Sequence, residues 1–168
     1  MSANTRSQPA AEPATAPVQP SRYWEDVAVG ETTRSRELTV DGVDMVAFAT
    51  KYDPQFFHAD AEAAKDSLFG GLIASGIYTA ALWRILDHEA NGDIAFVCGV
   101  QWDDVRWRKA VRAGDRLVAS SECLSKRPSA SRPGVGLAVL RHALTNQDGD
   151  TVFSFDSTDL IYRRPDGA

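Results

Sequence analysis

The chain has 168 residues, of which 43% are hydrophobic and 24% are charged, and its formal net charge is −5. This length suits a domain that buries its core without disulfides or structural metals. The acidic balance argues against nucleic acid as the main partner, because proteins that bind it usually carry a basic face. No apolar run approaches the ~20 residues that cross a bilayer, and the two cysteines lack C-x-x-C spacing. We therefore expect a cytoplasmic protein that uses no membrane, metal or redox cofactor.

Residues 1–20 differ in composition from the rest of the chain. They hold four of the eight prolines, five alanines and no aromatic residue. Such a segment buries too little apolar surface to offset the entropy lost on ordering. We expect residues 1–20 to form a disordered tail and residues 21–168 to form a single domain.

The first predicted elements are a strand and a short helix. The strand is expected to run through residues 38–40. Asp41 is a suitable helix N-cap, and apolar residues then recur at helical spacing as far as Tyr52. Pro54 ends this helix, because the residue before a proline is pushed out of the α region.

A longer helix and a series of strands follow. Residues 60–65 fit a single helical turn, and residues 77–88 contain no helix breaker and are apolar on most sides, which predicts a buried helix. The strands expected after it span residues 94–98, 100–107, 116–125, 135–145 and 151–163. The pattern predicts an α+β fold in which an antiparallel sheet wraps around one central helix.

Asp53 and His58 are the first candidate catalytic residues. Five residues apart, they would point to different sides of a regular helix or strand, so they converge only on irregular backbone, which Pro54 supplies. A carboxylate and an imidazole beside Phe56 and Phe57 would be partly desolvated, which suits general acid–base catalysis. The plainer alternative is an Asp that caps a turn and a His on a loop.

Gly76 is a candidate oxyanion donor. It opens the predicted buried helix, where the first backbone N–H groups have no partner within the helix and lie at the positive end of its dipole. A carbonyl oxygen that gains negative charge would be stabilised there, provided that the entrance residue lacks a side chain. Alternatively, the glycines of this segment only allow close packing.

Together these motifs resemble the MaoC-like dehydratases, close to the (R)-specific enoyl-CoA hydratases with the hot-dog fold. The resemblance rests on Asp-x-x-x-x-His at residues 53–58 and on Phe-Gly-Gly-Leu-Ile-Ala-Ser-Gly at residues 69–76, and it extends over most of residues 22–163. It implies an enzyme that adds water reversibly to a trans-2-enoyl-CoA to give an (R)-3-hydroxyacyl-CoA. Coenzyme A is then part of the substrate, and no cofactor is needed.

The resemblance also implies the role of each site residue. Asp53 and His58 correspond to the dyad that places and activates a water, and Gly76 corresponds to the glycine whose N–H receives the thioester oxygen. Two positions depart from the family pattern, since Gln55 replaces its usual Asn and Phe56 replaces its proline. The residues expected to contact the substrate are Gln55, Phe56, Phe57, Gly71, Ser75, Lys126, Arg127, Ser131 and Arg132.

The segment from Lys126 to Arg132 mixes three cations and hydroxyl groups with no acid. This composition suits the phosphates of coenzyme A, because Arg makes forked contacts and Ser adds donors. A solvated loop between two strands is the alternative.

Two alternative functions and one expectation about assembly complete the sequence-based view. A hot-dog thioesterase would bind the same acyl-CoA, and a non-catalytic acyl-CoA-binding module is a second alternative, although the Asp–His pair favours the hydratase. One sheet on one helix leaves an edge strand exposed, and hot-dog proteins pair such edges, so a homodimer is expected.

Overall fold

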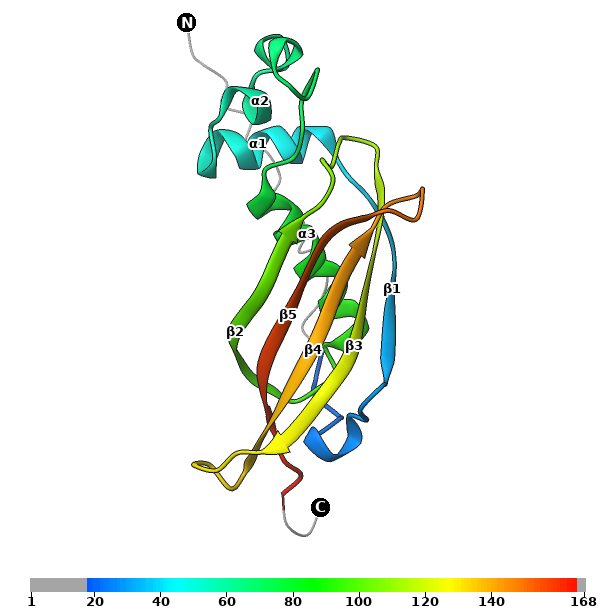
Figure 1. Cartoon of the computed structure of the whole chain (residues 1–168), viewed down its shortest axis with the longest axis vertical. Helices are drawn as coiled ribbons and strands as arrows, with labels where there is room; N and C mark the ends of the chain where they lie inside the picture. The colour runs from blue at the N-terminus through cyan, green and yellow to red at the C-terminus, as the bar shows by residue number, and fades with distance from the viewer. Residues whose placement is uncertain (1–17, 166–168) are drawn as a thin grey trace, which may run out of the picture.

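The computed structural model describes residues 18–165, so that most of the expected disordered tail lies outside the described residues. The domain contains five strands and three α-helices (Figure 1). In chain order these are β1 (Thr32–Thr39), α1 (Gly42–Tyr52), α2 (Phe56–Ala59), α3 (Gly76–Asn91), β2 (Phe96–Trp107), β3 (Arg116–Pro128), β4 (Val135–Thr145) and β5 (Thr151–Tyr162). Single 3₁₀ turns lie at Trp24–Asp26 and Ala63–Asp66.

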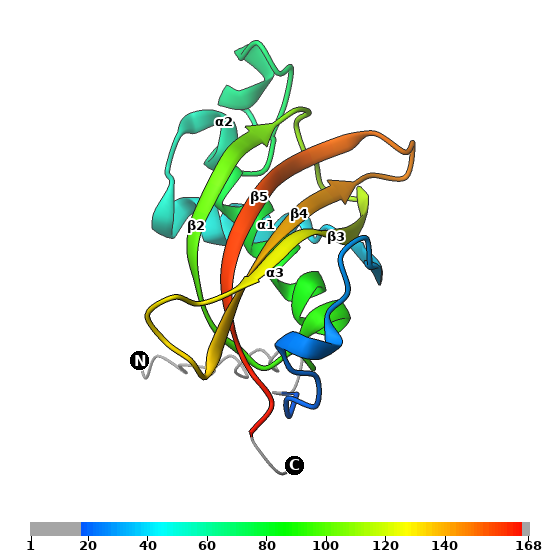
Figure 2. The same ribbon diagram turned by 60° about the horizontal axis from the view of Figure 1, so that its bottom comes forward.

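The five strands form one antiparallel sheet in the order β1-β3-β4-β5-β2. The sheet curves around α3, which lies along one of its faces (Figure 2). Along β4 the residues alternate between deeper and shallower burial, as expected of a strand with one face on a core. The α+β architecture predicted from the sequence is therefore confirmed.

The core lies between α3 and the sheet. Leu82 and Leu86 of α3 pack in one cluster with Leu117, Phe153 and Phe155 of the strands, and each of the five is at most 5% exposed. The opposite side of α3 faces away from the sheet, and Ile77 there is 59% exposed. The predicted central helix is therefore confirmed, and it is buried on the side that packs against the sheet.

Most predicted element boundaries are confirmed within a few residues. Asp41 caps α1, because its carboxylate accepts hydrogen bonds from the N–H groups of Val43 and Asp44. The two strands expected at residues 94–98 and 100–107 are instead one strand, β2. Its register against β5 shifts on either side of Gly99, so the glycine marks an irregularity within a continuous strand.

The segment between α1 and α3 lies at one end of the sheet, beyond the end of β2 (Figure 1). It contains α2, a 3₁₀ turn and an extended stretch that leads into Gly76. Within residues 18–165, no helix is both long and apolar enough to pass through a membrane.

Candidate active site

Asp53 terminates α1 and is held by two side chains. Its Oδ2 accepts a hydrogen bond from the Ser75 hydroxyl at 2.7 Å, and its Oδ1 accepts one from the Gln55 amide at 3.1 Å. These bonds, that of Ser75 first, lower the pKa of Asp53 against the opposing effect of burial, and His58 lowers it further. Asp53 is therefore a carboxylate at neutral pH. Gln55, longer than the Asn of the family pattern, still reaches it.

His58 is buried on α2, with one ring nitrogen fixed by the backbone. Nδ1 lies 2.8 Å from the Ile73 carbonyl oxygen. A carbonyl only accepts hydrogen bonds, so Nδ1 carries a proton and Nε2 is the nitrogen left for chemistry. Nε2 faces Asp53 Oδ2 at 3.7 Å.

The two groups converge because the chain between them is irregular. Asp53 has φ −152° and ψ 66°, and α2 begins only after Pro54 and Gln55. At 3.7 Å, His58 Nε2 and Asp53 Oδ2 are too far apart for a direct hydrogen bond but close enough for one water to contact both. The expectation that Asp53 and His58 meet on a proline-broken loop agrees with this geometry.

Gly76 begins α3 beside the imidazole. The first helical hydrogen bond runs from the Thr79 N–H to the Ser75 carbonyl, so the N–H of Gly76 precedes the helical ladder. The indole of Trp107 donates to the Gly76 carbonyl at 2.9 Å, and a Cβ at position 76 would lie 3.0 Å from that indole nitrogen. Close approach of Trp107 therefore requires a glycine here.

His58 and Gly76 share the wall of a pocket of about 380 Å³. Phe57 and Phe69 supply aromatic walls, with ring centroids 5.4 Å apart, and Trp107 lies against Gly76. The Asp53 side chain is 21% exposed and is not among the residues that line this pocket, but its Oδ2 lies 3.7 Å from His58 Nε2, which is. A molecule in the pocket would thus meet His58, the aromatic rings and the start of α3.

Arg112 forms hydrogen bonds to the backbone of the loop that carries Phe69, a residue of the pocket wall. Its guanidinium donates to the carbonyl oxygens of Phe69 at 2.6 Å and Leu72 at 3.1 Å. Gly71, expected to contact substrate, has φ +152°, a conformation that favours glycine, and does not line the pocket; a Cβ there would make an ordinary contact, at 3.6 Å, with Arg112 Nη1. Gly71 and Arg112 therefore shape the loop.

Several residues expected to contact the substrate take other positions. Ser75 is fully buried and bonds to Asp53, so it holds the carboxylate. Phe56 is 50% exposed and lies outside the lining of the pocket. The Lys126 ammonium donates to the carbonyl oxygens of Trp24 and Val27, at 2.6 Å each, and lies 4.3 Å from the Trp24 ring centroid. Backbone carbonyls and an indole thus occupy Lys126, which corrects its assignment to substrate phosphates.

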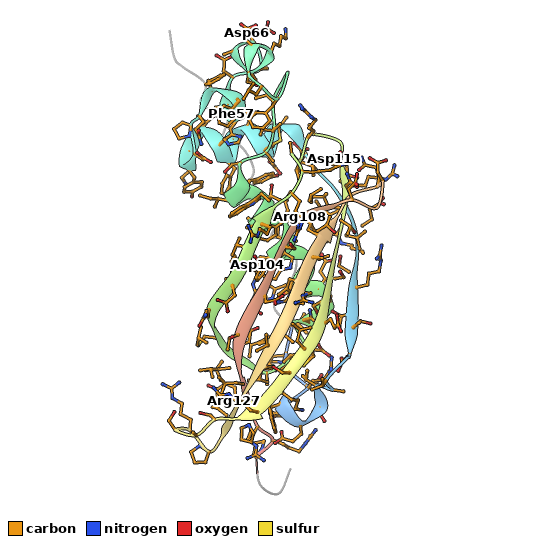
Figure 3. All side chains as sticks on the ribbon, viewed as in Figure 1. Phe57, Asp66, Asp104, Arg108, Asp115 and Arg127 are labelled. Carbon is orange, nitrogen blue, oxygen red and sulfur yellow. The ribbon has the colours of Figure 1, made fainter. Side chains whose placement is uncertain are left out.

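The other expected substrate contacts in the basic loop, as we call the segment from Lys126 to Arg132, are exposed but lie far from Asp53 and His58 of the same chain. Arg127 lies at the end of the sheet opposite to Phe57 (Figure 3). Ser131 and Arg132 belong to the same turn between β3 and β4. This loop therefore cannot complete the site of its own chain.

Sequence reasoning missed three groups that shape the site. These are the Ile73 carbonyl that fixes the His58 tautomer, the Trp107 indole that bonds to Gly76, and the Arg112 guanidinium. A backbone carbonyl leaves no mark in a sequence, and the other two lie more than 30 residues along the chain from their partners.

Comparisons with known proteins identify the family. The family described as MaoC-like domain matches residues 26–142. An uncharacterized Bacillus subtilis protein, YdeM, is 31% identical over 140 residues, which cover 83% of this chain and 98% of that protein.

Solved structures extend the comparison to the fold. The MaoC-like dehydratase from Rhodospirillum rubrum is 36% identical, with a TM-score of 0.81 over 86% of this chain and 99% of that one. The R-hydratase PhaJ1 from Pseudomonas aeruginosa is 20% identical, with a TM-score of 0.65 over 84% of this chain and 86% of that one, and it supports the hot-dog fold alone. The chain therefore belongs to the MaoC-like dehydratase family.

Proposed function

We propose that the protein is a hydratase that adds water reversibly to a trans-2-enoyl-CoA thioester and gives an (R)-3-hydroxyacyl-CoA. The observation that carries this proposal is the pair formed by Asp53 Oδ2 and His58 Nε2, 3.7 Å apart, beside the first N–H of a helix. Membership of the MaoC-like dehydratase family supports the same reaction class.

The pair suits the placing of one water. Asp53 Oδ2 and His58 Nε2 both face the gap between them, and a water there contacts both groups at once. One member of the pair takes a proton from this water as the new oxygen–carbon bond forms at Cβ, and the other delivers a proton to Cα. The acidic member must carry the proton that goes to Cα when the step begins, so the pair holds one exchangeable proton throughout. Hydration moves this proton from one member to the other, and the reverse reaction moves it back.

The start of α3 suits the developing negative charge. As Cβ is attacked, charge moves onto the thioester oxygen, and the Gly76 N–H at the positive end of α3 stabilises it. The aromatic walls of Phe57 and Phe69 exclude water from the reacting carbons. Together these groups require no bound cofactor in the proposed mechanism.

Arg127, Ser131 and Arg132 serve this proposal only from a second copy of the chain. If the β2 edges of two copies pair antiparallel, opposite ends of the two sheets meet, and the basic loop of one copy lies at the dyad end of the other. Replacing both Arg127 and Arg132 by Ala should then raise KM for an enoyl-CoA about tenfold. The KM for the matching N-acetylcysteamine thioester, which lacks the phosphates, should stay unchanged.

A thioesterase is the alternative enzyme, and one assay separates the two activities. Incubation with crotonyl-CoA should remove the absorbance of the conjugated double bond without releasing thiol. Release of free coenzyme A at a comparable rate would support hydrolysis instead. No change in either signal across enoyl-CoA substrates of graded length would favour a non-catalytic binding protein and contradict our proposal.

A further inference from the structure

A second cavity, of about 520 Å³, lies between the C-terminal half of α3 and the strands β2, β4 and β5. Asp87 of α3, His142 of β4 and Asp159 of β5 line it. Asp87 follows Gly76 by about three helical turns, or ~16 Å along the axis. The cavity is therefore separate from the pocket that holds His58.

His142 has a ring nitrogen with no hydrogen-bond partner in this cavity wall. Its Nε2 lies 3.0 Å from the Ser157 hydroxyl, which itself donates to the Asp159 carboxylate. Since that hydroxyl has a single proton, Nε2 is the donor to Ser157, and Nδ1 carries a lone pair. Nδ1 is fully buried and unpartnered, and the carboxylate oxygen of Asp87 at 3.7 Å is another acceptor. Buried acceptors in folded proteins almost always receive a hydrogen bond, so His142 Nδ1 is suited to a ligand that donates one.

Asp159 lacks a basic partner. The Asp87 carboxylate is paired with Arg84 at 2.7 Å, whereas none of the ion pairs among residues 18–165 includes Asp159. Partial burial raises the pKa of Asp159 to about 6, so that at pH 7.5 it is a partly buried carboxylate without a counter-ion. Gly99 makes room for it, because a Cβ at that position would lie 3.1 Å from Asp159 Oδ1. A cation in the cavity would stabilise this charge.

Two indole rings complete the wall. Trp83 and Trp102 both line the cavity, with ring centroids 5.5 Å apart and planes at 89°, and Trp102 is 46% exposed. Aromatic faces attract organic cations through their quadrupole. The described residues contain no group of three or more His, Cys, Asp or Glu side chains arranged to hold a metal ion, which favours an ammonium group as the cation.

We propose that this cavity is a second binding site, which takes a small organic ammonium ion. The ammonium N–H groups donate to the Asp159 carboxylate and to His142 Nδ1, and the organic part lies against Trp83 and Trp102. This site does not depend on the proposed hydratase activity, because none of its residues touches Asp53 or His58.

Benzylammonium chloride is a suitable probe, with benzyl alcohol as its neutral counterpart. In calorimetric titration of the full chain at pH 7.5, benzylammonium should bind saturably at one site per chain, and benzyl alcohol at least about tenfold more weakly. Asp159→Asn should weaken benzylammonium binding by at least about tenfold. Asp156→Asn is the matched control, because Asp156 lies on the same strand but pairs with Arg141 outside this cavity. The affinity of this variant for benzylammonium should equal that of the unmodified protein.

Two further measurements keep the test independent of folding and of the dyad. For the unmodified protein, affinity should fall as pH is lowered from 7.5 to 5, because Asp159 gains a proton near pH 6 while the amine stays charged. The other titratable or charged groups that line the cavity are Arg84, Asp87, His88, Cys98 and His142. Asp53→Asn should bind the probe like the unmodified protein. Absence of saturable binding, equal binding of the alcohol, or binding unaffected by Asp159→Asn would overturn the proposal.

Discussion

The Ser75 hydroxyl donates a hydrogen bond to Asp53 Oδ2 at 2.7 Å and accepts one from the Ile77 N–H at 3.3 Å. One buried side chain thus joins the carboxylate to the first turn of α3, where the Gly76 N–H lies. The positions of the Asp53 carboxylate and of the proposed oxyanion donor are therefore coupled through a single oxygen atom.

Ser75→Ala should move the pH dependence of activity. The hydrogen bond from Ser75 is the largest cause of the lowered pKa of Asp53, so its loss raises that pKa. The acidic limb of kcat/KM should consequently shift to higher pH. Gln55→Ala removes the second donor and should shift the limb in the same direction by a smaller amount. An unchanged limb in Ser75→Ala would mean that Asp53 ionisation does not control the reaction.

Substitutions of Asp53 and His58 should have non-additive effects on kcat. Asp53→Asn keeps the shape of the side chain but removes its charge, and His58→Ala removes the imidazole. Each should lower kcat on an enoyl-CoA by about 10²–10⁴, with a much smaller change in KM, and the double variant should be little slower than either. A folded Asp53→Asn that retained most of the hydration rate would contradict the mechanism.

Gly76 allows a matched test of the oxyanion donor. Proline suits the first position of a helix, and the preceding Ser75 already has the extended ψ of 143° that proline demands. Gly76→Pro therefore deletes the N–H while the helix still starts, and Gly76→Ala brings similar crowding against Trp107 but keeps the N–H. Gly76→Pro should show a kcat about 10²–10³ below that of Gly76→Ala. Equal rates would remove Gly76 from the mechanism.

How far the sequence predicts this molecule depends on whether the interactions are local. Asp41 caps α1, and Pro54 prevents this helix from continuing to His58. Both effects depend only on neighbouring residues, so both can be predicted from the sequence. The split of β2 was wrong because Gly99 is accommodated by pairing with β5, which lies some 60 residues away. Lys126 is basic and belongs to a basic segment, yet Trp24 and Val27 at the far end of the chain determine its contacts. Composition alone does not encode such contacts.

The exposed edge of the sheet predicts a homodimer. Val100 and Trp107 of β2 are each more than half exposed, and β2 has β5 on only one side. Sedimentation at micromolar concentration should give a dimer, and Val100→Glu should shift it toward monomer. Val29→Glu is the control, since Val29 is 60% exposed away from β2. A monomeric unmodified protein would contradict this expectation and the role of the basic loop in a second copy.

The cluster around His142 predicts an unusual pH dependence of stability. Burial lowers the pKa of His142 from 6.5 to about 4, so the unfolded chain binds that proton more tightly, and stability falls as pH drops from about 6.5 to 4. Burial raises the pKa of Asp159 from 3.8 to about 6, so there the folded chain binds the proton more tightly, and stability rises over nearly the same interval. The two effects oppose each other in the unmodified protein.

Asp159→Asn should leave the His142 effect unopposed. Its free energy of unfolding, measured by urea denaturation, should therefore fall more steeply between pH 6.5 and 4 than that of the unmodified protein. His142→Gln should show the reverse, because the stabilising protonation of Asp159 then acts alone. In the unmodified protein the Asp156 carboxylate pairs with Arg141 on the other face of the sheet. The control variant Asp156→Asn should therefore follow the curve of the unmodified protein. Parallel curves for all four proteins would show that neither His142 nor Asp159 changes its protonation on unfolding.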